Sequence, residues 1–270
     1  MCMSIHFHKY QATGNDFVLI DNRKVKRSFS ATEIRQICDR RFGVGADGLI
    51  LIEEAKDADF NMIYYNSDGS QSLCGNGCRS AVDFASSLQI INKNTTFQAF
   101  DGIHLASIEH DNTIRLKMND VSGINKLNDD YFINTGSPHY IRFVKNLADI
   151  NVVEDGRKIR NSDLFKPGGT NANFVELLPE NTIAVRTFER GVEDETLSCG
   201  TGVTAAALAA SFRGYHSPVK VKVMGGDLAV EFKAGSHLTS LTGHNQLSDT
   251  FIDIFLIGPA KMVFEGDLEL

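Results

Sequence analysis

Two short glycine-rich segments, each opened by a cysteine, occur once in each half of this 270-residue chain. Cys74 opens the sequence CGNG and Cys199 opens CGTG, so the two cysteines are 125 residues apart (199 − 74). Small residues follow each segment and predict helices over 76–88 and 201–212. A cysteine just before a helix lies where unpaired backbone N–H groups and the helix dipole favour negative charge. Both thiols are therefore expected to ionise readily.

Two matched thiols indicate a symmetric reaction. One thiolate can remove a proton from one face of a carbon while the other thiol protonates the opposite face, which is a two-base racemisation or epimerisation. Since the Cα–H of an amino acid is a weak acid, the site must stabilise the carbanion through its carboxylate and must exclude water. Glycines let backbone N–H groups approach that carboxylate closely. Such a site requires neither pyridoxal phosphate nor a metal.

Other roles for the five cysteines remain open. Cys2 and Cys38 are expected to be buried apolar residues, as most cytosolic cysteines are. The spacing of Cys74 and Cys78 also suits two zinc ligands, although Val203 occupies the matching position in the second half. The competing hypothesis is a thiol-based metal-binding or redox protein, whereas the duplicated motif predicts no metal and no cofactor.

The composition is that of a soluble globular protein, with 42% apolar and 23% charged residues. The formal net charge of −7 argues against nucleic-acid or membrane partners, because both bind basic surfaces. No apolar segment approaches the roughly 18 residues of a membrane span, and the start of the sequence lacks a signal-peptide pattern. We therefore expect a cytoplasmic protein with free thiols that acts on a small molecule.

The two halves also share the order of their expected elements. In each, a β-rich run leads into an acidic loop, the Cys-Gly-x-Gly segment, its helix and then a hairpin sequence. A carboxylate, Asp68 or Glu193, lies six residues before each cysteine. The pattern indicates an internal duplication. It predicts an α+β fold of two pseudo-symmetric lobes with a boundary near residues 118–123.

Four segments together resemble the motifs of the diaminopimelate epimerase family: ATGNDFVLID (12–21), RRFGVGADGLI (40–50), NSDGSQSLCGNGCRS (66–80) and ERGVEDETLSCGTGVTA (189–205). The resemblance extends over nearly the whole chain. It implies a cofactor-independent isomerase that interconverts LL- and meso-2,6-diaminopimelate by proton transfer at Cα, in the synthesis of lysine and peptidoglycan precursors. It also implies two lobes, each a β-barrel-like sheet around a central helix, and a homodimer.

The resemblance assigns one cysteine to each lobe. It implies an N-terminal lobe of residues 1–118 and 259–270 with Cys74, and a C-terminal lobe of residues 119–258 with Cys199. The two thiols are implied to exchange the roles of proton donor and acceptor with the direction of the reaction.

Further site residues follow from the same resemblance. His139 resembles a histidine near the first cysteine, and Glu189 would have the matching role near the second. The alternative for His139 is a structural histidine after a turn proline. The residues implied to contact the substrate are Asn15, Asn66, Gly75, Asn76, Asn171, Glu189, Arg190, Gly200 and Thr201.

Two positions depart from the family pattern. Many members have glutamine where this chain has Gly48, and asparagine where it has Ser137. Both changes are expected to alter contacts to the distal end of the substrate. The alternative function is therefore a racemase or epimerase of the same fold that acts on another amino acid, of the proline or histidine type.

Overall fold

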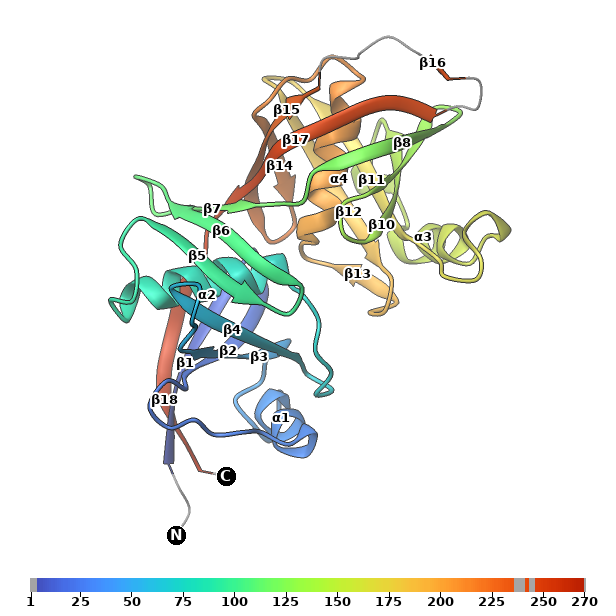
Figure 1. The fold of residues 1–270 in the computed structure, drawn as a ribbon. Coiled ribbons are helices and arrows are strands. Elements are labelled where there is room, and N and C mark those ends of the chain that lie inside the picture. The colour runs from blue at the N-terminus through green and yellow to red at the C-terminus, as the bar shows by residue number, and fades with distance from the viewer. Residues whose placement is uncertain (1–3, 236–240, 243–245, 270) are drawn as a thin grey trace. The chain divides into compact units, whose positions relative to one another are not determined.

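The computed structural model describes residues 4–235, 241–242 and 246–269 (Figure 1). The chain divides into two compact units: unit 1 comprises Met1–Leu116 and Gly258–Leu270, and unit 2 comprises Lys117–Ile257. Cys2 and most of a strand that the sequence pattern predicts at 237–241 lie outside the described residues.

The sheet of unit 1 has the strand order β18-β1-β2-β3-β4-β5-β6-β7. Its strands are β1 (Ser4–Ala12), β2 (Asn15–Asp21), β3 (Gly48–Glu53), β4 (Phe60–Asn66), β5 (Asn94–Ala99), β6 (Gly102–Ile108), β7 (Ile114–Lys117) and β18 (Lys261–Glu269). β2 and β3 are parallel and read as continuous apolar runs because helices cover both of their faces.

One helix packs on each face of this sheet. α1 (Ala31–Cys38) buries Ile34, Ile37 and Cys38 against one face, which confirms the expectation that Cys38 is an apolar core residue. α2 (Gly75–Ser87) contacts β1, β2, β3 and β4 on the other face. Cys78 lies one turn into α2 and is fully buried. Small residues along α2 let the helix lie close to the strands.

Unit 2 contains a closed barrel in which β8 pairs with β9 at one end of the row and with β17 at the other. Its strands are β8 (Val121–Leu127), β9 (Asp130–Asn134), β10 (Pro138–Val144), β11 (Asn171–Leu178), β12 (Thr182–Glu189), β14 (Val219–Val223), β15 (Gly226–Ala234) and β17 (Gln246–Gly258). Outside the barrel lie β13 (Asp194–Thr196), β16 (Leu241–Thr242), α3 (Val152–Arg160) and two 3₁₀ turns, η1 (Leu147–Asp149) and η2 (Asp163–Phe165).

α4 (Gly200–Ser211) is the central helix of this barrel (Figure 1). Its residues from Gly202 to Ala210 are all buried, and the helix has apolar side chains on every side. A helix that is apolar all round must be enclosed. The row of small residues predicted from the sequence is therefore explained by enclosure within the strands.

The strand pairs confirm the duplication. From β18 to β7 in unit 1, and from β8 to β17 in unit 2, successive pairs are antiparallel twice, then parallel, antiparallel, parallel and antiparallel twice. In unit 1 Gly48 pairs with Phe17, and in unit 2 Asn171 pairs with His139. Each unit is thus an α+β lobe with a long helix on the equivalent face of an equivalent sheet.

Candidate active site

Cys74 is the N-cap residue of α2 and is half-buried. Its Sγ accepts a hydrogen bond from the backbone N–H of Gly77 at 3.5 Å, and its thiol donates to Oδ1 of Asn15, also at 3.5 Å. The N–H group suits a thiolate and the amide oxygen suits a thiol. Both protonation states of Cys74 therefore have a partner, as a group that alternates between proton donor and acceptor requires.

Asn15 connects Cys74 to other predicted site residues of unit 1. Its Oδ1 accepts from Nδ2 of Asn76 at 3.3 Å, and its own Nδ2 donates to Asp47. Oδ1 of Asn76 in turn accepts from Arg79 at 3.0 Å. Because these side chains hold one another, the amide oxygen beside the thiol has a defined direction.

Cys199 is the N-cap residue of α4 and is 7% exposed. Its Sγ lies 3.5 Å from Oγ1 of Thr201. That hydroxyl also lies 2.9 Å from Nε2 of His139 and 3.1 Å from Oγ of Ser137. The second thiol therefore shares its helix start with a compact group of hydroxyl and imidazole side chains.

His139 is fully buried within this group. The resemblance implied a position near the first cysteine, whereas the structure places His139 beside Thr201, at the start of the helix that Cys199 caps. Nδ2 of Asn173 donates to the carbonyl oxygen of Tyr140 at 3.1 Å, which identifies it as the amide nitrogen, and it also lies 3.1 Å from Nδ1 of His139. Nδ1 must therefore accept, and Nε2 carries the proton that it donates towards Ser137 and Thr201. Burial lowers the pKa of His139 to about 3. The imidazole is a neutral donor at neutral pH.

Asn171 and Arg190 meet at one edge of unit 2. Oδ1 of Asn171 accepts from the backbone N–H of Arg190 at 2.8 Å, and its Nδ2 donates to the carbonyl oxygen of Pro138 at 3.0 Å. Glu189 accepts a hydrogen bond from Thr196 at 3.0 Å. These contacts place the predicted substrate residues of unit 2 at the ends of β10, β11 and β12.

Asn66 is the last residue of β4 in unit 1, and its side chain is hydrogen-bonded to the acidic loop that follows. Its Nδ2 donates to Oγ of Ser70 at 3.0 Å, and its Oδ1 accepts from Ser72 at 3.2 Å. Gly75 and Gly200 are the first residues of their helices. The first helical hydrogen bonds run from the N–H of Cys78 to the carbonyl oxygen of Cys74, and from the N–H of Val203 to that of Cys199. The backbone N–H groups that precede Cys78 and Val203 therefore have no acceptor within the helix backbone.

A second motif that is repeated in the two units, a Thr-Gly pair, was not among the sequence predictions. Thr13-Gly14-Asn15 corresponds to Thr135-Gly136-Ser137, and both triplets lie at the start of equivalent strands, β2 and β10. Asn15 contacts Asn76 just as Ser137 contacts Thr201. The repeated Thr-Gly pair, 122 residues apart (135 − 13), was the signal for this match.

The two departures from the family pattern have structural explanations. A Cβ atom on Gly48 would lie 2.4 Å from the Tyr64 ring and 2.4 Å from the carbonyl oxygen of Tyr65, so the ring occupies the space that a side chain would need. Ser137 contributes the hydroxyl that lies 2.9 Å from Nε2 of His139. Both departures therefore belong to well-packed local arrangements.

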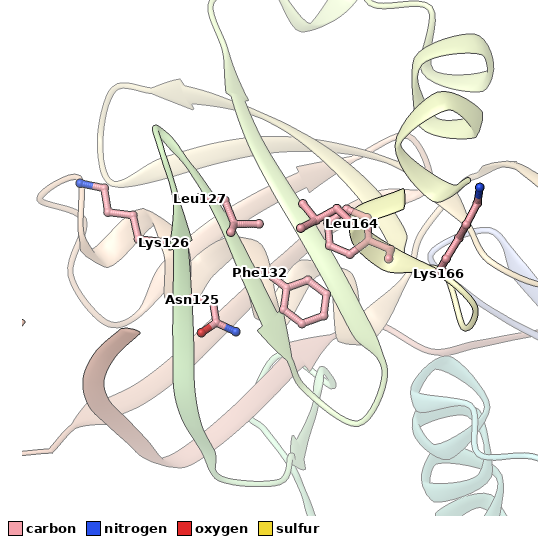
Figure 2. A pocket seen from close by; sticks show the side chains of 8 residues that line it. Asn125, Lys126, Leu127, Phe132, Leu164 and Lys166 are labelled. Atoms are coloured by element: carbon pink, nitrogen blue, oxygen red, sulfur yellow. The ribbon is translucent and has the colours of Figure 1, made fainter. Parts of the chain in front are cut away.

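A cavity of about 510 Å³ lies elsewhere in unit 2 (Figure 2). Leu127, Phe132 and Leu164 line it, together with Lys126 and Lys166. None of its lining residues is a predicted site residue, and none belongs to a helix start with a cysteine. Its size therefore does not make it the candidate active site.

The zinc alternative finds no support in the described residues. There, the group of three or more side chains whose ligand atoms lie close enough for a metal is His6, His8 and Glu265 on β1 and β18. Neither Cys74 nor Cys78 belongs to it.

In the same described part of the chain, no helix is long and apolar enough to cross a membrane.

The burial of His139 predicts a pH-dependent stability. The unfolded chain takes up a proton near pH 6.5, whereas the folded chain does so only near pH 3. Between these values the unfolded state binds more protons, so this contribution is complete above pH 6.5 and is lost as the pH falls, by at most about 1.4 kcal/mol per pH unit. Urea unfolding at several pH values is expected to show that slope, and His139→Gln to reduce it. His110→Gln, at an exposed histidine, is the control; equal slopes in all three proteins would contradict the assignment.

Comparison with known proteins decides the family. The sequence model described as diaminopimelate epimerase matches residues 7–124 and, separately, residues 131–248. The chain belongs to the diaminopimelate epimerase family. Because the model matches once in each half, it also reports the duplication. Membership in the diaminopimelate epimerase family makes the chain an isomerase, as the sequence predicts.

Named diaminopimelate epimerases resemble this family member over almost their whole length. That of Flavobacterium psychrophilum is 48% identical over 96% of this chain and 98% of its own. That of Chlorobaculum tepidum is 40% identical over 95% of this chain and 98% of its own. The similarity to these epimerases therefore includes both of the duplicated motifs.

Solved structures with similar folds include more distant proteins. A phenazine biosynthesis protein of the PhzF family from Bacillus anthracis has a TM-score of 0.72 at 15% identity, covering 99% of this chain and 100% of its own. A hydroxyproline epimerase from Agrobacterium vitis has a TM-score of 0.68 at 14% identity, covering 100% of this chain and 94% of its own. At such low identity these likenesses extend to the fold alone.

Proposed function

We propose that this chain interconverts LL- and meso-2,6-diaminopimelate by epimerisation at Cα, in the synthesis of lysine and peptidoglycan precursors. The observation that carries the proposal is the placement of one cysteine at the N-cap of each duplicated helix. The named relatives support the substrate, because they are diaminopimelate epimerases over nearly the same length. A racemase of the proline or histidine type is not favoured by these relatives.

Proton transfer is assigned to Cys74 and Cys199. One thiolate takes the Cα proton of the substrate while the other thiol protonates the opposite face, and the roles reverse in the other direction. Asn15 and the Gly77 N–H serve the thiol and thiolate forms of Cys74, respectively. Thr201, oriented by the neutral His139, is the corresponding partner of Cys199.

Charge that develops on the substrate carboxylate requires donors. The backbone N–H groups of Gly75-Asn76 and Gly200-Thr201 precede the first helical hydrogen bonds and lie at the positive ends of the helix dipoles. They are the proposed oxyanion donors, which the chemistry needs because the Cα–H is weakly acidic. This arrangement uses no cofactor and no metal.

The remaining substrate contacts are assigned to polar residues at the ends of the same strands. Asn15, Asn66, Asn171, Glu189 and Arg190 are proposed to bind the amino and carboxyl groups of the substrate. The departures at Gly48 and Ser137 are proposed to affect the distal end.

The lobe boundaries, oligomeric state and compartment belong to the same proposal. Residues 1–118 with 259–270 are the lobe that contributes Cys74, and residues 119–258 are the lobe that contributes Cys199. The enzyme is proposed to act as a homodimer in the cytoplasm.

Turnover of pure LL-diaminopimelate by chelator-treated protein, with no cofactor added, tests the function. We expect meso-diaminopimelate to accumulate to equilibrium, with L-proline and L-histidine unchanged under the same conditions. Racemisation of either of those amino acids without turnover of diaminopimelate would favour the alternative. Turnover that disappears after chelation and returns with zinc would contradict the metal-free chemistry.

A further inference from the structure

Arg79 lies five residues after Cys74 and is fully buried in α2. Its Nη2 donates to Oγ1 of Thr13 at 3.2 Å and to Oδ1 of Asn76 at 3.0 Å, and its Nε donates to the carbonyl oxygen of Pro259 at 3.5 Å. Within the described part of the chain its Nη1 has no hydrogen-bond partner. A buried cation held only by neutral groups is costly. Its presence therefore points to a role for the charge.

The charge persists at neutral pH, and one nearby group can balance it. Burial lowers the pKa of Arg79 to about 10, which still leaves the guanidinium protonated. The titratable groups that act on it are Cys74 and Cys78. Burial raises the pKa of Cys78 far above its ordinary value, so that thiol stays neutral. A thiolate at Cys74 is the remaining counter-charge.

Hydrogen bonds connect the guanidinium to the reactive thiol. Arg79 donates a hydrogen bond to Oδ1 of Asn76. Nδ2 of Asn76 donates to Oδ1 of Asn15, and the same oxygen accepts from the thiol of Cys74. The other charges joined to this network through Asp47 balance one another. They form an ion-pair group of Lys9, Asp16, Arg40 and Asp47. Two further carboxyl groups are close to α2: Asp101 acts on Cys78, and Asp83, in the helix itself, shares a hydrogen bond with Tyr10.

The duplicated lobe lacks this charge. The residue that corresponds to Arg79 is Thr204, five residues after Cys199, and its hydroxyl donates to the carbonyl oxygen of Gly200 at 2.9 Å within the helix. Two thiols in equivalent backbone positions therefore have different electrostatic surroundings. At this helix position the cation is present beside the first thiol alone, whereas the charge that acts on the group around Cys199 is that of Arg190, through His139.

We propose that Arg79 is a positioning residue whose buried charge stabilises the thiolate of Cys74 in preference to that of Cys199, while the Asn76–Asn15 network holds the acceptor for the thiol form. The inference rests on the proposed two-thiol function and adds to it an order of ionisation. In the resting enzyme Cys74 is the readier base, and Cys199 is the readier acid.

Alkylation by iodoacetamide over a range of pH tests the proposal, with the Cys74 and Cys199 peptides quantified separately by mass spectrometry. The thiolate is the species that reacts, so the pH midpoint of each rate reports the ionisation of that thiol. In the wild type we expect the midpoint of Cys74 to lie about one pH unit below that of Cys199. Arg79→Met is expected to raise the Cys74 midpoint by about one unit, in line with loss of a nearby opposite charge. The Cys199 midpoint should not move.

Arg79→Lys separates the charge from the hydrogen-bond geometry. It keeps the positive charge but not the planar donor set, so it is expected to retain a Cys74 midpoint close to that of the wild type. Thr204→Val, the matched change in the other lobe, should leave both midpoints unchanged. A Cys199 midpoint below that of Cys74 in the wild type, or equal shifts in Arg79→Lys and Arg79→Met, would overturn the proposal. Because the assay needs no substrate, its outcome is independent of whether diaminopimelate is turned over.

Discussion

Replacement of Cys74 or Cys199 by alanine is expected to reduce epimerase turnover by about 10³-fold. Each variant leaves the substrate with an acid or a base on one face but not on the other, and general acid–base groups are typically worth about 10²–10⁴ in rate. Because the proposed mechanism uses both thiols in each turnover, the two variants are expected to have similar losses. The initial rate of formation of meso-diaminopimelate from the LL isomer measures the effect.

Cys78→Ala is the matched control for thiol loss. Cys78 lies in the helix that Cys74 caps, one turn further on, but it is fully buried and its thiol stays protonated. Its removal is expected to lower stability modestly and to leave turnover within a few-fold of the wild type. If Cys74→Ala retained most of its turnover, or if Cys78→Ala lost as much as Cys74→Ala, the assignment of the thiols would be wrong.

Gly202→Ala is expected to damage the site and the fold together. A Cβ atom at this position would lie 2.4 Å from Oδ1 of Asn173 and 3.3 Å from the His139 ring. Asn173 cannot simply rotate away, because Thr187 donates to its Oδ1 at 2.9 Å and its Nδ2 holds the histidine. Forcing atoms into so tight a place costs about 1–3 kcal/mol. We expect a destabilisation of that size in urea unfolding, accompanied by a large loss of turnover.

Gly75→Ala is the control for this substitution in the equivalent helix. The nearest atom to its added Cβ is Cδ2 of Leu116 at 4.0 Å, which is ordinary van der Waals contact. Alanine in a helix is also favoured over glycine by about 0.5–1 kcal/mol, so Gly75→Ala is expected to be as stable as the wild type or more stable. An equal loss of stability in the two variants would show that helix-start glycines are required for another reason.

The architecture was largely predictable because the duplication can be recognised from short sequence patterns. Each lobe repeats the order of strand, acidic loop, cysteine, helix and hairpin, and a repeated order of elements folds into a repeated topology. The burial of Cys38 also followed from the usual behaviour of free cysteines. The resemblance implied a barrel-like sheet, but local patterns could not show that β8 and β17 close it, because this pairing joins residues far apart in sequence.

Several site features needed the fold for a similar reason. Asn173 is an ordinary strand residue in sequence, yet it determines which nitrogen of His139 carries the proton. Arg79 reads as a surface residue of a helix, but the strands enclose that side of α2 and bury its charge. Tertiary packing, rather than local propensity, decides both cases. The Thr-Gly echo at Thr13 and Thr135 was available in the sequence but is too short to stand out by itself.

The labelling of substrate and product in deuterated water tests the two-base mechanism most directly. Wild-type enzyme should be given LL-diaminopimelate in D₂O and sampled during the first few per cent of reaction. The proton taken by one thiol stays on that side, while the other thiol, already exchanged with solvent, delivers deuterium. We therefore expect deuterium at Cα of the new meso product and hydrogen in the remaining LL substrate. Product that retains the original hydrogen, or substrate and product labelled equally from the start, would contradict proton transfer by two separate thiols.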